Sequence, residues 1–282
     1  MCCLFLAASS TVAIAQTNVV DLVNPIIGTN GMGHTFPGAC VPFGLVQLSP
    51  DTDTIPHNVD GKYQPRSYEY CAGYQHKDSS IVGFSHTHFS GTGHSDLGDI
   101  LIMPTTGTLK LNPGTATNPD GGYRSRFSHD TEISRPGYYE VMLADYGVKA
   151  QLTTTQRAGI HKYTYPTNSE NQRIILDMIH GIYNYDGKVL WTNIRVENDT
   201  LVTGYRITNG WARTNYTYFA MSFSKPITHY GCEEKAKVNY RGGYANFNMK
   251  ENFPDIGGRK IVAYFDFDPK TSDELEVKVA LS

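Results

Sequence analysis

Leu275-Glu276-Val277-Lys278-Val279-Ala280-Leu281 alternates apolar residues with polar or small ones. Successive side chains of an extended chain point to opposite faces, so this alternation predicts a β-strand with one buried face. Similar runs, rich in β-branched and aromatic residues, recur with turn-forming residues between them. They span residues 149–155, 161–165, 173–178, 201–207, 216–223 and 260–267. Many short strands without a long helical pattern predict an all-β fold, a large antiparallel β-sandwich.

The composition fits one large domain of this class. The chain has 282 residues, of which 40% are hydrophobic and only 18% charged. The net charge is -3, so there is no basic field to attract nucleic acid or an anionic membrane. Three cysteines outside the first 16 residues, Cys40, Cys71 and Cys232, are too few and too scattered for a disulfide framework. We expect at most one disulfide.

Residues 1–16 have the pattern of a secretory signal peptide. Leu4-Phe5-Leu6-Ala7-Ala8 is a short apolar core, and Ala13-Ile14-Ala15 is a small-residue cleavage site. The segment is too short to span a bilayer. It has no preceding Lys or Arg, which suggests that the natural start lies upstream. We expect residues 17–282 to form the mature domain, secreted or periplasmic, with attachment to the cell surface as a further location.

The segment from Gly83 to Asp99 contains most of the candidate functional residues of the chain. It places three histidines and two aspartates in a glycine-rich loop, between apolar runs at residues 80–84 and 100–103 that read as strands. Glycines let backbone approach a ligand closely, and binding loops are usually carried at strand ends. The candidate ligand-binding residues are His86, His88, His94, Asp96 and Asp99, together with His34 in another glycine-rich stretch. The alternative is that an individual histidine only stabilises the loop through hydrogen bonds and binds no ligand.

A longer stretch has a distinctive sequence: residues 21–51, DLVNPIIGTNGMGHTFPGACVPFGLVQLSPD. With Cys71-Ala72-Gly73-Tyr74, Ser85-His86-Thr87-His88 and Leu97-Gly98-Asp99-Ile100, it resembles the start of glycoside hydrolase family 92, a family of exo-acting alpha-mannosidases found mostly in bacteria. The resemblance runs from Val19 to the end of the chain. These matches are several residues long and fall in the right order, which makes the resemblance specific.

The resemblance implies a two-domain, calcium-dependent, inverting enzyme. An N-terminal β-sandwich precedes a helical (alpha/alpha)6 barrel, which supplies the general acid, the general base and most groups around the calcium. By this resemblance the chain is the N-terminal sandwich alone, and its partners are a mannose-containing glycan and the C-terminal helical domain in cis. We therefore expect no catalytic residue here, only substrate contacts from His34, His86, His88, His94, Asp96 and Asp99.

Within the resemblance, His94 takes the place expected to face the sugar on the leaving-group side. Members that cleave alpha-1,2 bonds are expected to carry a tryptophan in this region. The tryptophans of this chain, Trp191 and Trp211, lie far along the sequence, and we expect both to be packed in the core.

The aspartates are weaker candidates for acid–base chemistry. Inversion requires two carboxyl groups about 6.5–9.5 Å apart, one of them protonated. For Asp51 and Asp53 we expect capping of their own turn, since Asp bonds nearby backbone amides. For Asp96 and Asp99 we expect loop scaffolding or substrate contact.

Two other functions remain open from the residues. One is a non-catalytic carbohydrate-binding β-sandwich. The other is a zinc-dependent hydrolase that uses His86 and His88.

Overall fold

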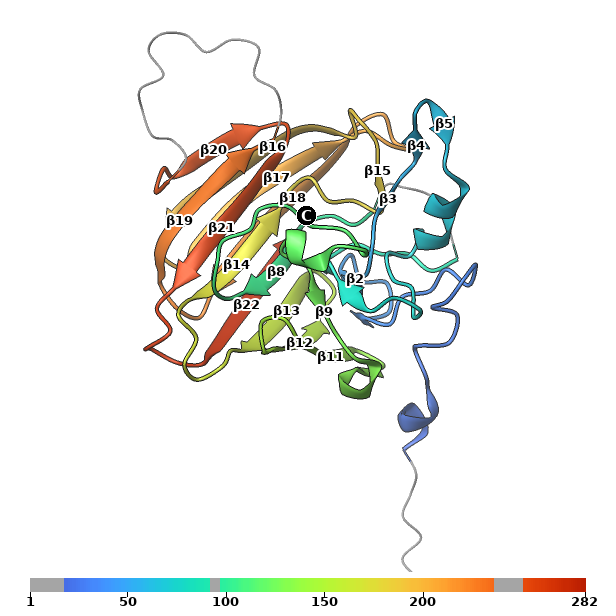
Figure 1. Ribbon diagram of the computed structural model, residues 1–282, viewed down its shortest axis with the longest axis horizontal. Coiled ribbons are helices and arrows are strands. Elements are labelled where there is room, and N and C mark those ends of the chain that lie inside the picture. Colours follow the sequence, from blue (N-terminus) through green and yellow to red (C-terminus); the bar gives the residue numbers. More distant parts are fainter. Residues whose placement is uncertain (1–17, 92–96, 236–250) are drawn as a thin grey trace, which may run out of the picture.

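A computed structural model of the chain describes residues 18–91, 97–235 and 251–282. It confirms the all-β prediction, with two large antiparallel sheets in the described residues (Figure 1). The first has seven strands, in spatial order β1 (Ala39–Cys40), β2 (Gln47–Asp51), β7 (Gly83–Ser85), β8 (Leu101–Thr105), β14 (Gln172–Asp177), β21 (Ile261–Phe267) and β19 (Ile227–Glu234).

The second sheet has nine strands within the same described ranges. Their spatial order is β10 (Ile133–Arg135), β11 (Tyr138–Leu143), β12 (Val148–Thr154), β13 (Ala158–Thr164), β22 (Glu274–Leu281), β18 (Asn215–Phe223), β17 (Leu201–Thr208), β16 (Val189–Asn198) and β20 (Asp255–Gly258). Each strand expected from the sequence is present, with ends within three residues of the prediction.

The smaller elements are short pairs of strands and single 3-10 turns. The pairs are β3 (Ile55–Pro56) with β15 (Tyr183–Asn184), β4 (Asn58–Val59) with β5 (Lys62–Tyr63), and β6 (Ser80–Ile81) with β9 (Ser125–Arg126). The 3-10 helices are η1 (Val19–Leu22), η2 (Pro65–Tyr70), η3 (Pro119–Gly121) and η4 (His129–Thr131).

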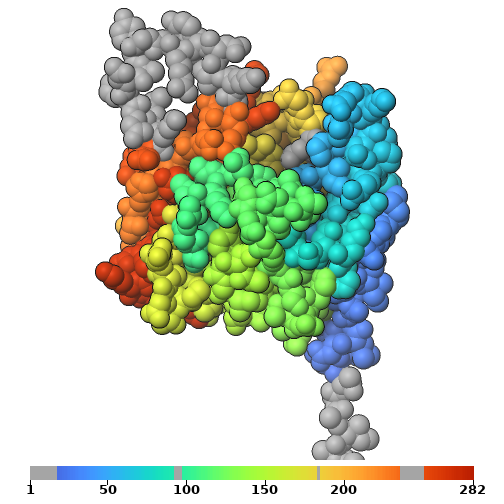
Figure 2. Space-filling view, viewed as in Figure 1, coloured from blue at the N-terminus to red at the C-terminus, as the bar shows by residue number. Residues whose placement is uncertain are grey.

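The burial pattern explains how the two sheets stack. Strands of the nine-stranded sheet such as β22 alternate strictly between buried and exposed residues, so one face is in the core and the other in solvent. Strands β8 and β14 are buried at every residue. The middle of the seven-stranded sheet is therefore covered on both faces. Figure 2 shows the green segment after β8 spreading over its outer side.

Two expectations about single residues are settled here. The prediction that both tryptophans are core residues is wrong, because Trp191 is 43% exposed and Trp211 is 75% exposed. Cys40, Cys71 and Cys232 form no disulfide with one another, which agrees with the expectation of at most one disulfide. Among the described residues, no helix has the length and apolar character needed to cross a bilayer.

Candidate functional site

Two glycine-rich loops meet at the end of the β7–β8 pair. The Gly91 amide donates to the carbonyl of His34 over 2.7 Å, which joins the loop after β7 to the loop around His34. His34 has a positive φ of 53° and its ring packs edge-on against Tyr68, with 4.7 Å between ring centroids. Its Nε2 is buried and has no hydrogen-bond partner in the described part of the chain. A buried polar atom without a partner is uncommon and marks His34 as a ligand-binding candidate.

His88 lies beneath this junction and is bound on both ring nitrogens. Nε2 is 2.7 Å from Asp51 Oδ1, and Nδ1 is 2.8 Å from the Gln47 carbonyl oxygen. On the other side of the same carboxylate, His180 Nε2 is 2.7 Å from Asp51 Oδ2. Asp51 is fully buried, so the three side chains form a closed ionic bridge inside the domain.

The protonation of this bridge follows from its geometry. Burial by itself raises the pKa of Asp51, but the charge of His88 and hydrogen bonds from His180 and His88 outweigh it, so the pKa is lowered overall. Asp51 is therefore a carboxylate and only accepts hydrogen bonds. Because a carbonyl and a carboxylate are both acceptors, His88 donates from both nitrogens and is an imidazolium. The prediction that Asp51 caps a turn is wrong.

Asp53 differs from Asp51. It accepts the amide of Thr54 over 2.9 Å, as expected of a turn aspartate, and it also pairs with Arg124 Nη2 over 2.9 Å. The capping prediction is thus confirmed for this residue. The difference arises because Asp51 ends a buried strand, whereas Asp53 lies outside it.

His86 belongs to a second buried chain of hydrogen bonds. Its Nδ1 is 2.5 Å from the Ile100 carbonyl oxygen, and its Nε2 is 2.9 Å from His161 Nε2. His161 Nδ1 is in turn 2.7 Å from the Tyr163 hydroxyl. A single assignment satisfies all groups: Tyr163 donates to His161, His161 donates to His86, and His86 donates to the carbonyl. Burial lowers the pKa of His86 to about 4 and that of His161 well below its usual range, so both are neutral.

Asp99 is held by Arg206, and both side chains are buried. Arg206 Nε is 3.1 Å from Asp99 Oδ1, and Nη2 contacts the same oxygen. The other carboxylate oxygen accepts the Thr87 hydroxyl over 2.8 Å, and Thr87 Oγ1 accepts the Asp99 amide over 2.9 Å. Arg206 also donates to the carbonyl of His180. Asp99 therefore ties the loop to β17 and to the segment after β14.

The predicted site residues thus fall into three groups. His34 is buried at the loop junction with an unpaired nitrogen, whereas His86, His88 and Asp99 lie below it with their polar atoms bonded to protein. His94 and Asp96 lie outside the described residues. Neither His86 nor His88 has a ring nitrogen left for a metal ion, so the geometry does not support a zinc hydrolase at this pair.

The sequence did not single out three partners in this region, His161, His180 and Arg206. Arg206 carried a usable signal, because it falls on the inward face of β17 with Val202 and Thr208, where an unpaired charge is not tolerated. His161 carried the same kind of signal, because it is a polar residue on the inward face of β13. His180 gave none, since its partner Asp51 lies far away in the sequence.

Comparison with known proteins places this arrangement among the glycosidases. The model of the glycosyl hydrolase family 92 N-terminal domain matches residues 22–282. A solved family GH92 alpha-mannosidase from Bacteroides thetaiotaomicron, in complex with mannoimidazole, is 39% identical with a TM-score of 0.79, covering 94% of this chain and 32% of that one.

Two further relatives agree. A solved GH92 inverting mannosidase from Bacteroides thetaiotaomicron VPI-5482 is 26% identical with a TM-score of 0.70, covering 97% of this chain and 32% of that one. An uncharacterized secreted glycosidase of Arthroderma benhamiae is 29% identical over 170 residues, which are 57% of this chain and 19% of that protein. The chain spans about a third or less of the length of these relatives.

Proposed function

Because this chain belongs to glycosyl hydrolase family 92, whose N-terminal domain it carries, we propose that it forms the N-terminal part of a secreted, calcium-dependent, inverting alpha-mannosidase. Its substrate is a mannose-containing glycan. The observation that supports a role in substrate binding is the junction of the two glycine-rich loops, where the buried His34 Nε2 has no partner in the described residues.

The His34 imidazole suits a sugar hydroxyl. A ring nitrogen can donate or accept a hydrogen bond, and a sugar hydroxyl does both. Phe89, two residues before Gly91, is 58% exposed and offers a flat apolar face in the same loop. Sites of this kind combine an apolar surface with a few placed polar groups. The bonded residues beneath, His88 and Asp99, hold the loop in shape so that these groups keep their positions.

The acid and the base come from the C-terminal helical domain in cis. Inversion needs two free carboxyl groups about 6.5–9.5 Å apart with a water between them. Asp51 is bonded to two histidines and Asp99 to an arginine, so neither is free in the described residues. The same two carboxylates do not fit a calcium site, since calcium takes six to eight oxygen ligands. We assign the calcium mainly to the C-terminal helical domain.

Secretion is supported by the signal-like residues 1–16 and by the similarity to the secreted glycosidase of Arthroderma benhamiae. Docking of a second domain is supported by large apolar side chains exposed in the N-terminal half. They include Leu22, Ile27, Met32 and Phe43, each at least 60% exposed. All four lie within one stretch of the chain, and large exposed apolar side chains are candidates for contact with a second domain.

The first test is an assay of the 282-residue chain alone on aryl and disaccharide alpha-mannosides with calcium. We expect no turnover, because the acid–base pair is missing. Turnover on the order of 1 s⁻¹, within the usual enzyme range, would overturn the two-domain proposal. When the chain is joined to a family C-terminal domain, hydrolysis should appear, and NMR of the first product should show inversion at the anomeric carbon.

The second test uses substitutions in that joined enzyme. A contact made equally in ground and transition states raises KM on removal and leaves kcat unchanged. His34→Ala and His94→Ala should both behave in this way. For His94→Ala the rise should be larger with a disaccharide than with an aryl mannoside, which lacks the leaving-group sugar. An equal loss of kcat on both substrates, in variants that melt normally, would rule out these contacts.

A second function, glycan binding without cleavage, is favoured by one observation. The outer face of the nine-stranded sheet exposes Trp191, Tyr216 and Tyr218, and the rings of the two tyrosines are stacked with 10° between their planes. A flat aromatic surface of this kind suits sugar rings. Affinity electrophoresis of the chain in mannan tests it. Retardation that is lost in Trp191→Ala but kept in His34→Ala would favour this function.

A further inference from the structure

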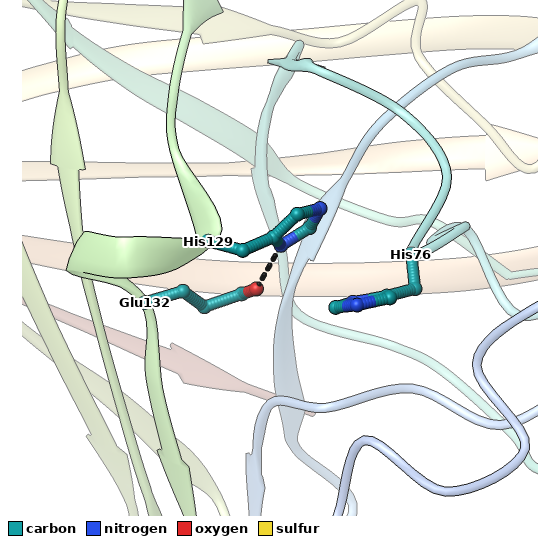
Figure 3. A group of neighbouring side chains, drawn as sticks. All are labelled: His76, His129 and Glu132. Atoms are coloured by element: carbon teal, nitrogen blue, oxygen red, sulfur yellow. Dashed lines mark hydrogen bonds and ion pairs between the residues drawn. The ribbon is translucent and has the colours of Figure 1, made fainter.

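Three side chains of the types that bind metals, His76, His129 and Glu132, lie close together. His76 lies in the loop after η2, whereas His129 and Glu132 come from η4 and the residue that follows it. Figure 3 shows the His76 ring facing the other two side chains across the gap between these segments. One ligand atom from each residue lies within 4.8 Å of the other two. The imidazole centroids of His76 and His129 are 3.9 Å apart.

The backbone holds these residues in position. The His76 amide donates to the Thr29 carbonyl over 2.8 Å, and the Glu132 amide donates to the His129 carbonyl over 3.2 Å. Ser128 caps η4 by accepting the Asp130 amide. In a tetrahedral zinc site with bonds near 2.0–2.1 Å, ligand atoms are about 3.3 Å apart. The ligand atoms of the three residues, all within 4.8 Å of one another, are therefore close to that spacing.

Glu132 is prepared as a ligand by two tyrosines. Its side chain is only 3% exposed. Oε1 accepts the Tyr74 hydroxyl over 2.8 Å and the Tyr139 hydroxyl over 2.6 Å, while Oε2 faces His129 Nδ1 at 2.6 Å. Burial and the charge of Glu132 raise the pKa of both tyrosines, so they remain donors. Carboxylates that bind metals are oriented by outer hydrogen bonds of this kind.

His76 provides the second, independent observation. Its Nδ1 is buried and makes no hydrogen bond to any residue in the ranges 18–91, 97–235 and 251–282. The neighbouring groups are the His129 ring and the Glu132 carboxylate, both of which are metal ligands in proteins. A cation in this gap would give the unpaired nitrogen a partner and would neutralise the buried carboxylate.

We propose that His76, His129 and Glu132 form a zinc site that joins the loop after η2 to η4. Two imidazoles and one carboxylate are a ligand set typical of zinc and unlike the all-oxygen set of calcium. Three protein ligands leave the fourth tetrahedral position to water. The site joins two segments that the hydrogen bond from Tyr74 to Glu132 already connects. It does not depend on the mannosidase proposal.

The test is zinc binding by the full chain after treatment with a chelator and dialysis. Calorimetry with ZnCl2 should show one equivalent bound with a dissociation constant in the micromolar range or below, and zinc should raise the melting temperature. Cobalt should bind in the same place and give the visible absorption of a tetrahedral complex. Calcium at the same concentration should do neither.

Substitutions test which residues bind the zinc ion. His76→Ala removes a ligand without touching the tyrosine network, and it should weaken zinc binding at least tenfold while the chain still melts cooperatively. Glu132→Gln should do the same. His229→Ala is the matched control, since His229 is a partly exposed histidine paired with Asp266 on β19 and β21. If wild type binds no zinc, or if His76→Ala binds it as tightly as wild type, the proposal is wrong.

Discussion

Asp51 and His88 form an ion pair that is wholly removed from solvent: Oδ1 and Nε2 are 2.7 Å apart, and both side chains are fully buried. His180 closes the other side of the carboxylate. The pair connects β2 to the glycine-rich loop, so the shape of the candidate sugar-binding loop depends on a charge interaction in the core.

We expect Asp51→Asn to destabilise the chain by about 3–5 kcal/mol. Removing one partner of a buried pair leaves the other charge uncompensated. Urea denaturation followed by circular dichroism measures the loss. The matched control is Asp186→Asn, whose carboxylate is exposed and pairs with Lys260 on the surface, so the loss of stability should be much smaller. Equal losses in both variants would contradict the bridge.

Gly73→Ala should be costly for a separate reason. Gly73 has a φ of 80°, and a Cβ there would lie 2.0 Å from Asp51 Oδ1. Gly107 has a similar φ of 72°, but a Cβ there meets nothing within 4 Å. Gly107→Ala therefore measures backbone strain alone, about 1 kcal/mol, whereas Gly73→Ala adds the clash and should cost about 3 kcal/mol or more. Thermal melts of the two variants measure this difference in stability.

The free energy of unfolding should decrease as the pH is lowered from about 6.5 to 4, because His86 is buried and neutral in the folded chain. Its folded pKa of about 4 lies below the usual 6.5, so the unfolded chain binds a proton first as the pH drops. The neutral histidine thus contributes fully above pH 6.5, and about 3 kcal/mol is lost by pH 4. His86→Asn should make this part of the profile less steep, and His161, whose pKa is also lowered by burial, should account for the slope that remains.

Arg206→Met should destabilise by about 3–5 kcal/mol, because it leaves Asp99 charged and buried. The double variant with Asp99→Asn should lose less than the sum of the single variants, since the two residues interact directly. A double-mutant cycle in urea measures the coupling. Simple additivity would show that the contact carries no interaction energy and that Asp99 is free to contact substrate.

The sequence alone determined the strands and the fold class. Alternation such as that of Leu275, Val277 and Val279 is a local property, because neighbouring side chains of a strand point to opposite faces. The strands β12, β13, β14, β17, β18, β21 and β22 therefore appear where the pattern predicted them. The family was also readable from the first hundred residues, since its motifs are contiguous and keep their order.

The partners of the site residues were decided only by tertiary structure. His180 and Asp51 are 129 positions apart, and Arg206 and Asp99 are 107 apart. They meet because the sheets set β2, β7, β8 and β14 side by side in an order that no local pattern encodes. For the same reason the sequence could not separate His34, whose Nε2 lacks a partner in the described residues, from His86 and His88, which are fully bonded in the core. Burial and pairing are properties of distant segments brought together, and they decide which polar residue of a loop is left for a ligand.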